Sequence, residues 1–243
     1  MTARIQYSNP NAASAETSTA PAAEFHRTMA GYRATPLTEI PALAAELGVG
    51  YVFVKDESNR FGLPAFKALG ASWASARVVW SAAGRAGLPA GFDELRVAAE
   101  SVPQLTLVTA TDGNHGRAVA RVAALLGLGA RIYVPRDTSE STCDAIRGEG
   151  AKLIELPEIY DDVVRAAAAS VDPATDRLVQ DTSWGGYTEV PQWIVDGYGT
   201  LFDEIAKQAP GPVDVVVIPT GVGSLLQAAV EHGRGARVLC VEP

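Results

Sequence analysis

The residues best placed to do chemistry are one lysine at the start of a helical pattern and the polar side chains of three glycine-containing turns. Lys67 follows the segment 55–66 and begins an alanine-rich helical pattern. A lysine held on a rigid element and shielded from water has a lowered pKa, because desolvation disfavours its ammonium form. Its free amine could then attack a carbonyl, as Schiff-base formation with an aldehyde cofactor requires. Taken alone, a helix-start lysine beside acidic neighbours is the simpler interpretation.

The first turn, residues 109–116, joins a strand pattern to a helix pattern. Gly113 and Gly116 let the backbone pass close to a ligand, and the N–H groups at the helix start can face an anion or a polar ring. Asn114 offers an amide and Asp112 a carboxylate. A tight turn capped by Asp112 is the alternative, since Asp-Gly-Asn is common turn chemistry.

The second turn has the same strand-to-helix setting and is built from Gly221, Val222, Gly223 and Ser224. Small residues and free N–H groups at a helix start suit a phosphate. The dinucleotide fingerprint is excluded because position 226 is leucine, and no Gly-Lys-Ser/Thr follows to make a Walker loop. A small phosphate monoester is therefore the better candidate, with a plain turn as the alternative.

The third turn begins with Asp181 and carries two aromatic residues, Trp184 and Tyr187. A carboxylate at the carboxyl end of a parallel strand points toward the ligand crevice of an open α/β sheet. The aromatic rings could form a wall of that crevice. A helix cap with aromatic packing explains these residues equally well.

Strand and helix patterns alternate from Gln104 to the end of the chain, which predicts an α/β fold with parallel sheets covered by helices on both faces. Residues 1–23, rich in Ala, Ser, Thr and Pro, are expected to form a flexible N-terminal arm. The last strand pattern, 237–241, is followed by no helix that could cover its sheet. We therefore expect the chain to be C-terminally truncated.

Composition excludes several classes of protein. The 243 residues carry a formal net charge of −8 without a basic run, so nucleic-acid binding through a basic face is not expected. Two cysteines and three histidines lack metal-ligand spacing, so we expect no metal. Neither a signal peptide nor an apolar run of about 20 residues appears, which predicts a cytoplasmic protein that does not enter the membrane.

Four segments, in this order, carry a resemblance to one family. The chain resembles the pyridoxal-phosphate enzymes of the tryptophan synthase β-like superfamily (fold type II), and within it the diaminopropionate ammonia-lyases. The segments are residues 55–67, 110–117, 181–187 and 221–224. The resemblance implies two open parallel-sheet α/β domains: an incomplete large cofactor domain (24–66 plus 191–243) and a smaller domain (67–190). It also implies a homodimer.

The resemblance assigns roles to the residues of the three turns. Lys67 would form the Schiff base with pyridoxal 5'-phosphate, Asn114 would lie near the phenolic oxygen of the cofactor, and the turn 221–224 would bind its phosphate. Asp112, where related dehydratases usually carry serine, would be a second base, and Asp181 would hold a substrate ammonium group.

The activity implied is elimination of ammonia from 2,3-diaminopropionate, an amino-acid substrate, to give pyruvate and ammonia. A dehydratase for serine or threonine is the alternative within the superfamily, and Asp112 argues against it. A truncated, non-catalytic homologue is the alternative from another class.

Overall fold

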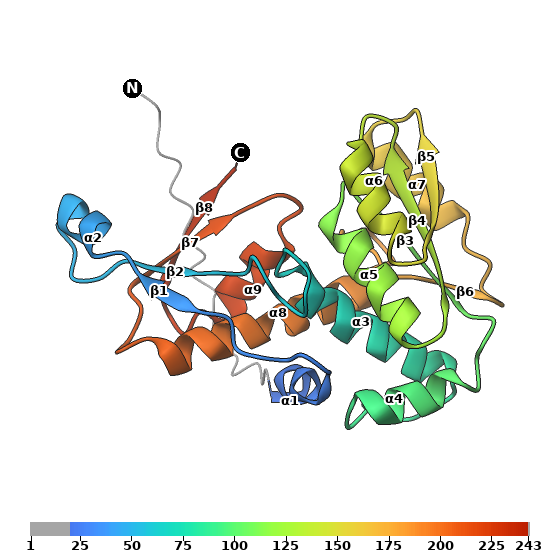
Figure 1. The fold of residues 1–243 in the computed structure, drawn as a ribbon, viewed down its shortest axis with the longest axis horizontal. Helices are drawn as coiled ribbons and strands as arrows, with labels where there is room; N and C mark the ends of the chain where they lie inside the picture. The colour runs from blue at the N-terminus through green and yellow to red at the C-terminus, as the bar shows by residue number, and fades with distance from the viewer. Residues whose placement is uncertain (1–19, 243) are drawn as a thin grey trace.

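Two long helices cross at the centre of the molecule and connect its two sides (Figure 1). They are α3 (Lys67–Ala82) and α8 (Glu189–Gln208) in the computed structural model, which describes residues 20–242. One side of the pair carries a four-stranded sheet, and the other carries two small sheets of two strands each. The order of elements along the chain alternates between helix and strand over most of its length, as predicted.

The larger sheet is parallel throughout and has the strand order β5-β4-β3-β6. Its strands, in chain order, are β3 (Thr106–Ala110), β4 (Gly129–Pro135), β5 (Lys152–Leu156) and β6 (Asp176–Leu178). The connecting helices are α5 (Asn114–Leu125), α6 (Glu140–Arg147) and α7 (Tyr160–Ala169).

Alternate residues of these strands enter two separate cores. Leu107 and Ile132 belong to the main core, which includes buried residues of α5, whereas Val108 and Tyr133 pack with Val163 of α7. Because successive side chains of a strand point to opposite faces, this division shows that α5 and α7 cover opposite faces of the sheet. The carboxyl ends of β3 and β6 then lie side by side at one edge.

The two small sheets differ from each other in direction. Strands β7 (Val215–Pro219) and β8 (Arg237–Val241), joined by α9 (Ser224–His232), pair in parallel. Strands β1 (Leu37–Glu39) and β2 (Phe53–Lys55), joined by α2 (Pro41–Leu47), pair antiparallel, whereas the sequence predicted parallel sheets only. The register pairs Leu37 with Lys55 and Glu39 with Phe53, so the two strands run in opposite directions.

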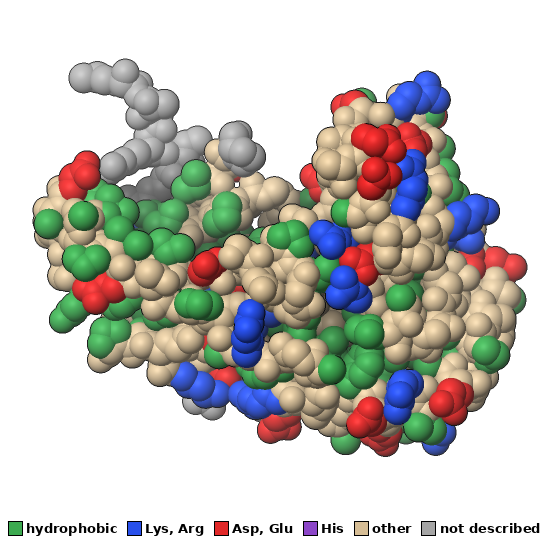
Figure 2. All heavy atoms as spheres, in the orientation of Figure 1, with side chains coloured by type: hydrophobic (Ala, Val, Ile, Leu, Met, Phe, Trp, Pro, Cys, Tyr) green, Lys and Arg blue, Asp and Glu red, His purple; other side chains and the backbone are tan. Residues whose placement is uncertain are grey.

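Large apolar side chains are exposed on this side of the molecule. On β7 and β8, Val217 is 58% and Val241 51% exposed, although parallel strands are usually buried on both faces. Further exposed apolar residues lie in and around α2 and β2, where green side chains gather at the left of Figure 2. The exposed residues there are Leu43, Leu47, Val49, Tyr51 and Val54.

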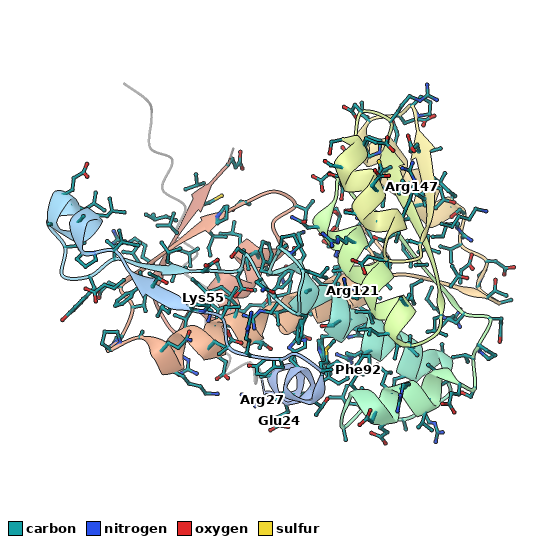
Figure 3. The ribbon with its side chains drawn as sticks, in the orientation of Figure 1. Glu24, Arg27, Lys55, Phe92, Arg121 and Arg147 are labelled. Atoms are coloured by element: carbon teal, nitrogen blue, oxygen red, sulfur yellow. The ribbon has the colours of Figure 1, made fainter. Side chains whose placement is uncertain are left out.

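Helix α1 (Ala20–Thr28) corrects the predicted extent of the N-terminal arm, of which residues 1–19 lie outside the described chain. Ala22 and Ala23 are each only 2% exposed, and Phe25 contacts Trp73 of α3 and Phe92 of α4 (Phe92–Ala99). Figure 3 shows Phe92 beside α1, with Glu24 and Arg27 on the outer side of that helix. Alanines that look like linker composition pack here because α3 and α8 provide an apolar surface.

Within residues 20–242, no helix has both the length and the apolar character needed to cross a membrane.

Glycines make the close crossing of α3 and α8 possible. A Cβ atom on Gly197 of α8 would lie 2.7 Å from the carbonyl oxygen of Leu69 and 2.8 Å from Cα of Gly70. A Cβ atom on Gly70 would in turn lie 2.6 Å from the ring of Tyr198. Real Cβ atoms do not approach other atoms this closely, so any side chain at these positions forces the helices apart.

We therefore predict that Gly197→Ala lowers the free energy of unfolding by about 1–3 kcal/mol, the usual cost of overpacking a core. Urea denaturation followed by circular dichroism measures the change. Gly211→Ala is the matched control, since a Cβ there meets nothing within 4 Å. Equal stability of the two variants would contradict the close crossing of the helices.

Candidate active site

An ion pair between Lys67 and Asp181 lies at the centre of the candidate site. The Lys67 amino nitrogen is 2.5 Å from Oδ2 of Asp181, and the two side chains are 20% and 3% exposed. Lys67 is the first residue of α3, and Asp181 lies three residues beyond the end of β6. Two of the predicted site residues are therefore brought together by elements far apart in the sequence.

The pKa of Lys67 is raised, so the predicted lowering is wrong for this structure. Burial alone would lower the pKa, but the acidic groups of Tyr198 and Asp181 outweigh it and favour the ammonium form. The sequence suggested burial but not that a carboxylate would lie within hydrogen-bond distance of the amine. Burial likewise opposes ionisation of Asp181, yet its ion pair with Lys67 helps to keep the pKa below the ordinary value.

Gln180 fixes the second oxygen of the Asp181 carboxylate. Its side chain is fully buried, and Oε1 accepts hydrogen bonds from the backbone N–H of Ala110 and from Thr109 Oγ1, both at 2.9 Å. The amide nitrogen is then directed to Oδ1 of Asp181, at 3.2 Å, and to the hydroxyl of Tyr160, at 3.3 Å. The carboxylate is therefore tied to the neighbouring strand β3 and does not depend on Lys67 alone.

The aromatic turn after Asp181 supports the same strand end. The Tyr187 hydroxyl accepts a hydrogen bond from the backbone N–H of Gln180 at 2.9 Å and donates one to the carbonyl of Leu178 at 3.1 Å. Its ring stacks on Trp184 with the centroids 4.4 Å apart. The structure thus gives Tyr187 a specific task, which is to hold the backbone that carries Asp181.

His115 is buried close to Asp181. Its Nε2 is 2.7 Å from the carbonyl oxygen of Val179, and its Nδ1 is 3.9 Å from Oδ2 of Asp181. Burial lowers the pKa of this imidazole, and the positive charge of Lys67 acts in the same direction.

Thr111, and not Asp112, caps the turn that contains Asp112. The hydroxyl of Thr111 accepts hydrogen bonds from the N–H groups of Gly113 at 2.9 Å and Gly116 at 3.1 Å. Asp112 does not cap the turn, and it is exposed. Burial lowers the pKa of His115, and the charge of Asp112 opposes this shift. The simple explanation of Asp112 as a helix cap is therefore wrong.

Asn114 is also exposed, and it lines a cavity of about 200 Å³. The cavity lies between Pro64, which precedes α3, and helix α6, and Arg117 borders it. Lys67 is not among the residues that line this cavity. The structure thus places Asn114 near the segment that leads to Lys67 without bringing the two side chains into contact.

Tyr198 connects Lys67 to the turn 221–224. Its fully buried hydroxyl lies beside Lys67 and Ser224, close enough for both to affect its pKa, which burial raises to about 12. Gly223 has φ +93°, and a Cβ on it or on Gly221 would meet nothing within 4 Å. The turn therefore leaves open space at the N-terminus of α9, beside the residue that contacts Lys67.

A tight turn sets the path of the chain into Lys67. Arg60 and Leu63 exchange two backbone hydrogen bonds of 2.8 and 2.9 Å, and both residues between them have positive φ angles. Gly62 accepts such an angle easily, whereas Phe61 does so at a cost in strain. A strained residue persists only where the surroundings determine its conformation. Arg60, which precedes Phe61, belongs to a buried ionic network.

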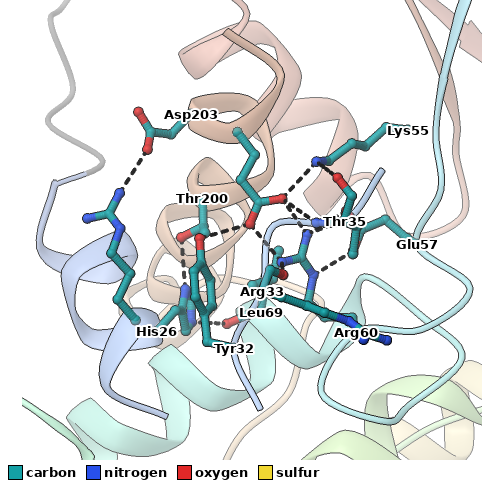
Figure 4. Close-up of polar contacts among 12 residues, drawn as sticks. His26, Tyr32, Arg33, Thr35, Lys55, Glu57, Arg60, Leu69, Thr200 and Asp203 are labelled. Carbon is teal, nitrogen blue, oxygen red and sulfur yellow. Dashed lines mark hydrogen bonds and ion pairs between the residues drawn. The ribbon is translucent and has the colours of Figure 1, made fainter. Parts of the chain in front are cut away.

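The network joins the segment before Lys67 to α8 (Figure 4). The guanidinium of Arg60, 1% exposed, bonds both oxygens of Glu204 at 2.7 and 2.8 Å. It also contacts Glu57 at 2.6 Å, while Lys55 lies 2.8 Å from Glu204. Thr35 donates its hydroxyl proton to Glu57. Burial opposes ionisation of Glu204, but its hydrogen bonds with Arg60 and Lys55 lower the pKa to about 2.

Sequence reasoning missed three residues of this site: Gln180, Tyr198 and His115. Tyr198 lies between two glycines within a helical pattern, and such glycines signal close packing. His115 was considered only as a metal ligand, although it belongs to the same turn as Asn114. No local signal in the sequence distinguishes Gln180 from any other buried polar residue.

Comparison with known proteins identifies the family. The family described as "Pyridoxal-phosphate dependent enzyme" matches residues 28–243. The diaminopropionate ammonia-lyase of Escherichia coli K12 is 43% identical over 209 residues, which are 86% of this chain and 51% of that protein. That of Salmonella typhimurium LT2 is 39% identical over 212 residues, 82% of this chain and 51% of that protein. The chain spans about half the length of these curated relatives.

Crystal structures of the E. coli enzyme have the same fold. Its apo form matches with a TM-score of 0.80 at 36% identity, covering 93% of this chain and 64% of that chain. Its complex with an aminoacrylate–PLP azomethine reaction intermediate matches with a TM-score of 0.80 at 37% identity, covering 93% and 59%. The chain belongs to the family of pyridoxal-phosphate-dependent enzymes of fold type II. Within that family, it is similar to the diaminopropionate ammonia-lyases.

The residues of the site fit the cofactor of this family. Pyridoxal phosphate needs a lysine amine for its aldehyde and an anion site for its phosphate. Lys67 supplies a partly exposed amine, and the open turn at Gly221 and Gly223 supplies N–H groups at a helix N-terminus. The amine and the turn both lie near one residue of α8, Tyr198.

The buried network yields a prediction about pH. Because the pKa of Glu204 in the folded protein, about 2, is below the ordinary value of 4.5, its ionised form stabilises the fold above about pH 4.5. That contribution is lost as the pH falls toward 2. We predict that Glu204→Gln costs about 3–5 kcal/mol at pH 7, since it leaves Arg60 and Lys55 buried without their carboxylate. The loss should shrink as the pH falls, which denaturation at several pH values measures.

Glu140→Gln is the matched control, because Glu140 pairs with Arg147 at the surface and is 75% exposed. Its loss should stay below about 1 kcal/mol at every pH. A Glu204→Gln variant that behaves like this control would contradict a stabilising role for the network.

Proposed function

We propose that this chain carries the catalytic residues of a pyridoxal-phosphate-dependent lyase that eliminates ammonia from 2,3-diaminopropionate. The overall reaction consumes one molecule of diaminopropionate and one of water, and it yields pyruvate and two molecules of ammonia. The observation that carries the proposal is the Asp181 carboxylate, which is buried at a strand end and binds an ammonium group, that of Lys67, at 2.5 Å. The similarity to the diaminopropionate ammonia-lyases supports the choice of substrate.

In this proposal, Lys67 holds the cofactor covalently, and the N–H groups of residues 221–224 bind its phosphate. When bound, the cofactor supplies an electron sink for a carbanion at Cα of the substrate. Attachment of Lys67 removes the ammonium that Asp181 now binds, which makes the carboxylate available for an ammonium group of the substrate. Gln180 keeps Oδ1 of Asp181 in place while the partner of Oδ2 changes.

Two groups can move the Cα proton in this arrangement. The Lys67 amine, once released from the cofactor, can take the proton from one face of the substrate. Asp112 has an exposed carboxylate, which makes it the candidate base for the other face. Because the α-amino group of 2,3-diaminopropionate would be used for attachment to the cofactor, its second amino group is the cation left for Asp181 to bind. Serine and threonine have no second amino group, so a dehydratase would leave Asp181 without a substrate cation. Homodimer assembly and a cytoplasmic location stay predictions.

The proposal is tested by pyruvate release from D- and L-2,3-diaminopropionate with added pyridoxal phosphate, and with L-serine and L-threonine as comparison substrates. We expect release from diaminopropionate, and loss of release in Lys67→Ala. Borohydride reduction and mass spectrometry should find the cofactor attached to the wild-type chain and to the Lys207→Ala control, whose lysine is exposed at the surface, but not to Lys67→Ala. Attachment to Lys67→Ala would rule out Lys67, and release mainly from serine or threonine would favour a dehydratase.

Asp112→Asn tests the second base. Because the amide cannot accept a proton, we expect turnover of one enantiomer of diaminopropionate to fall by about 10²–10⁴-fold, the usual contribution of a general base. Turnover of the other enantiomer should change much less, since Lys67 serves it. Separate kcat measurements on the two enantiomers decide the matter, and equal losses would defeat the two-base arrangement.

A further inference from the structure

His115 is a buried imidazole in which only one of the two nitrogens makes a hydrogen bond within residues 20–242. Its Nε2 is 2.7 Å from the carbonyl oxygen of Val179. Because a carbonyl oxygen can only accept, Nε2 carries the ring proton. The buried Nδ1, which has no hydrogen-bond partner, is then a lone-pair acceptor. Buried polar atoms are nearly always paired in native proteins, so this one requires an explanation.

The geometry around Nδ1 supplies a candidate partner. Nδ1 is 3.9 Å from Oδ2 of Asp181, the same oxygen that the Lys67 ammonium holds at 2.5 Å. Oδ2 of Asp181 therefore lies near two nitrogens that can each carry a positive charge. In this structure the Lys67 ammonium group binds it. Oδ1 is held separately by Gln180, so the carboxylate could turn its other oxygen toward His115 without leaving its place.

The charged and titratable groups around His115 come from several elements. Lys67 of α3 favours the neutral ring, as burial does, whereas Asp181 and Asp112 favour the charged ring. Tyr160 of α7 interacts with both carboxylates and with Lys67, and the buried Tyr198 of α8 lies beside Lys67. Loss of the Lys67 charge removes one of the influences that keep the ring neutral and leaves two carboxylates that favour its protonation.

We propose that His115 is the reserve cationic partner of Asp181. When Lys67 no longer carries a positive charge, Nδ1 takes up a proton from solvent and donates a hydrogen bond to Oδ2. One N–H bond forms at Nδ1, one O–H bond of hydronium breaks, and water is released. His115 is thus a positioning residue that keeps the carboxylate ionised and oriented until another ammonium group arrives. The working cycle rests on the proposed function, because cofactor attachment is what would take the Lys67 ammonium group away from Asp181.

The test is ¹⁵N NMR of histidine side chains in the full chain, without cofactor, in the wild type and in Lys67→Met. The chain has only three histidines, so a His115→Gln spectrum suffices to assign the signals. We expect the midpoint of His115 protonation to rise by about one pH unit or more in Lys67→Met, as the loss of a nearby like charge requires. Adding Asp181→Asn to Lys67→Met should cancel the rise, and Lys207→Met should leave the midpoint unchanged.

An unchanged His115 signal in folded Lys67→Met between about pH 5 and pH 8 would overturn the proposal, as would a rise that persists without the Asp181 carboxylate. His26 reports the fold, because its buried ring bonds Thr200 at 2.8 Å and the carbonyl of Leu69 at 3.1 Å. If Lys67→Met does not fold, Lys67→Gln, with an uncharged polar end, provides the same comparison. Since no cofactor or substrate is present, failure here is separate from failure of the proposed lyase activity.

Discussion

The close crossing of α3 and α8 is the constraint on which the candidate site depends. Gly70 and Gly197 bring the two helix backbones together, and Tyr198, the residue after Gly197, lies against the start of α3. Lys67 begins α3, so the crossing decides how near the lysine comes to the tyrosine. Through Tyr198, it also sets the position of Ser224 relative to Lys67. The geometry of this part of the site thus depends on having glycine at positions 70 and 197.

Asp181 is held in a different way, by polar groups that also bond the backbone of neighbouring strands. Gln180 binds the end of β3 with its oxygen and the carboxylate with its nitrogen, and Tyr187 binds the backbone on both sides of Val179. Such satisfied buried networks hold a single arrangement, because each alternative leaves a polar group without a partner. The carboxylate can therefore exchange one cation for another while its own position is maintained. The proposed role of Asp181 as an ammonium-binding group requires this property.

The order of the elements could be predicted from the sequence because it depends on local patterns. The strand Arg237–Val241 has the predicted bounds, and helices begin at the two predicted strand-to-helix turns, α5 at Asn114 and α9 at Ser224, since apolar periodicity and glycines mark them. Helix α1 and the antiparallel pairing of β1 with β2 were not predicted, because local patterns set neither the packing of α1 on α3 and α8 nor the direction in which two strands pair.

The difference between local sequence patterns and tertiary contacts also explains which site residues could be predicted. The types of Lys67 and Asp181 suggested chemistry, but only the fold shows that the two form an ion pair, which reverses the expected pKa shift of the lysine. Asp112 and Asn114 lie on the exposed side of their turn, where the sequence pattern alone did not decide between capping and function. Gln180 and His115 each contact a buried partner from another part of the chain. Sequence periodicity does not identify such residues, so they can be recognised only once the tertiary contacts are known.

The two cysteines have opposite environments, and this has a practical consequence for the exposed strands β7 and β8. Cys143 is buried in α6, whereas Cys240 lies exposed on β8, next to the exposed Leu239 and Val241. A thiol reagent applied to the folded protein will therefore label essentially one position. The labelling rate becomes a reporter for anything that covers this sheet, whether another polypeptide or a second molecule of the same chain, and reading it requires no change to the sequence.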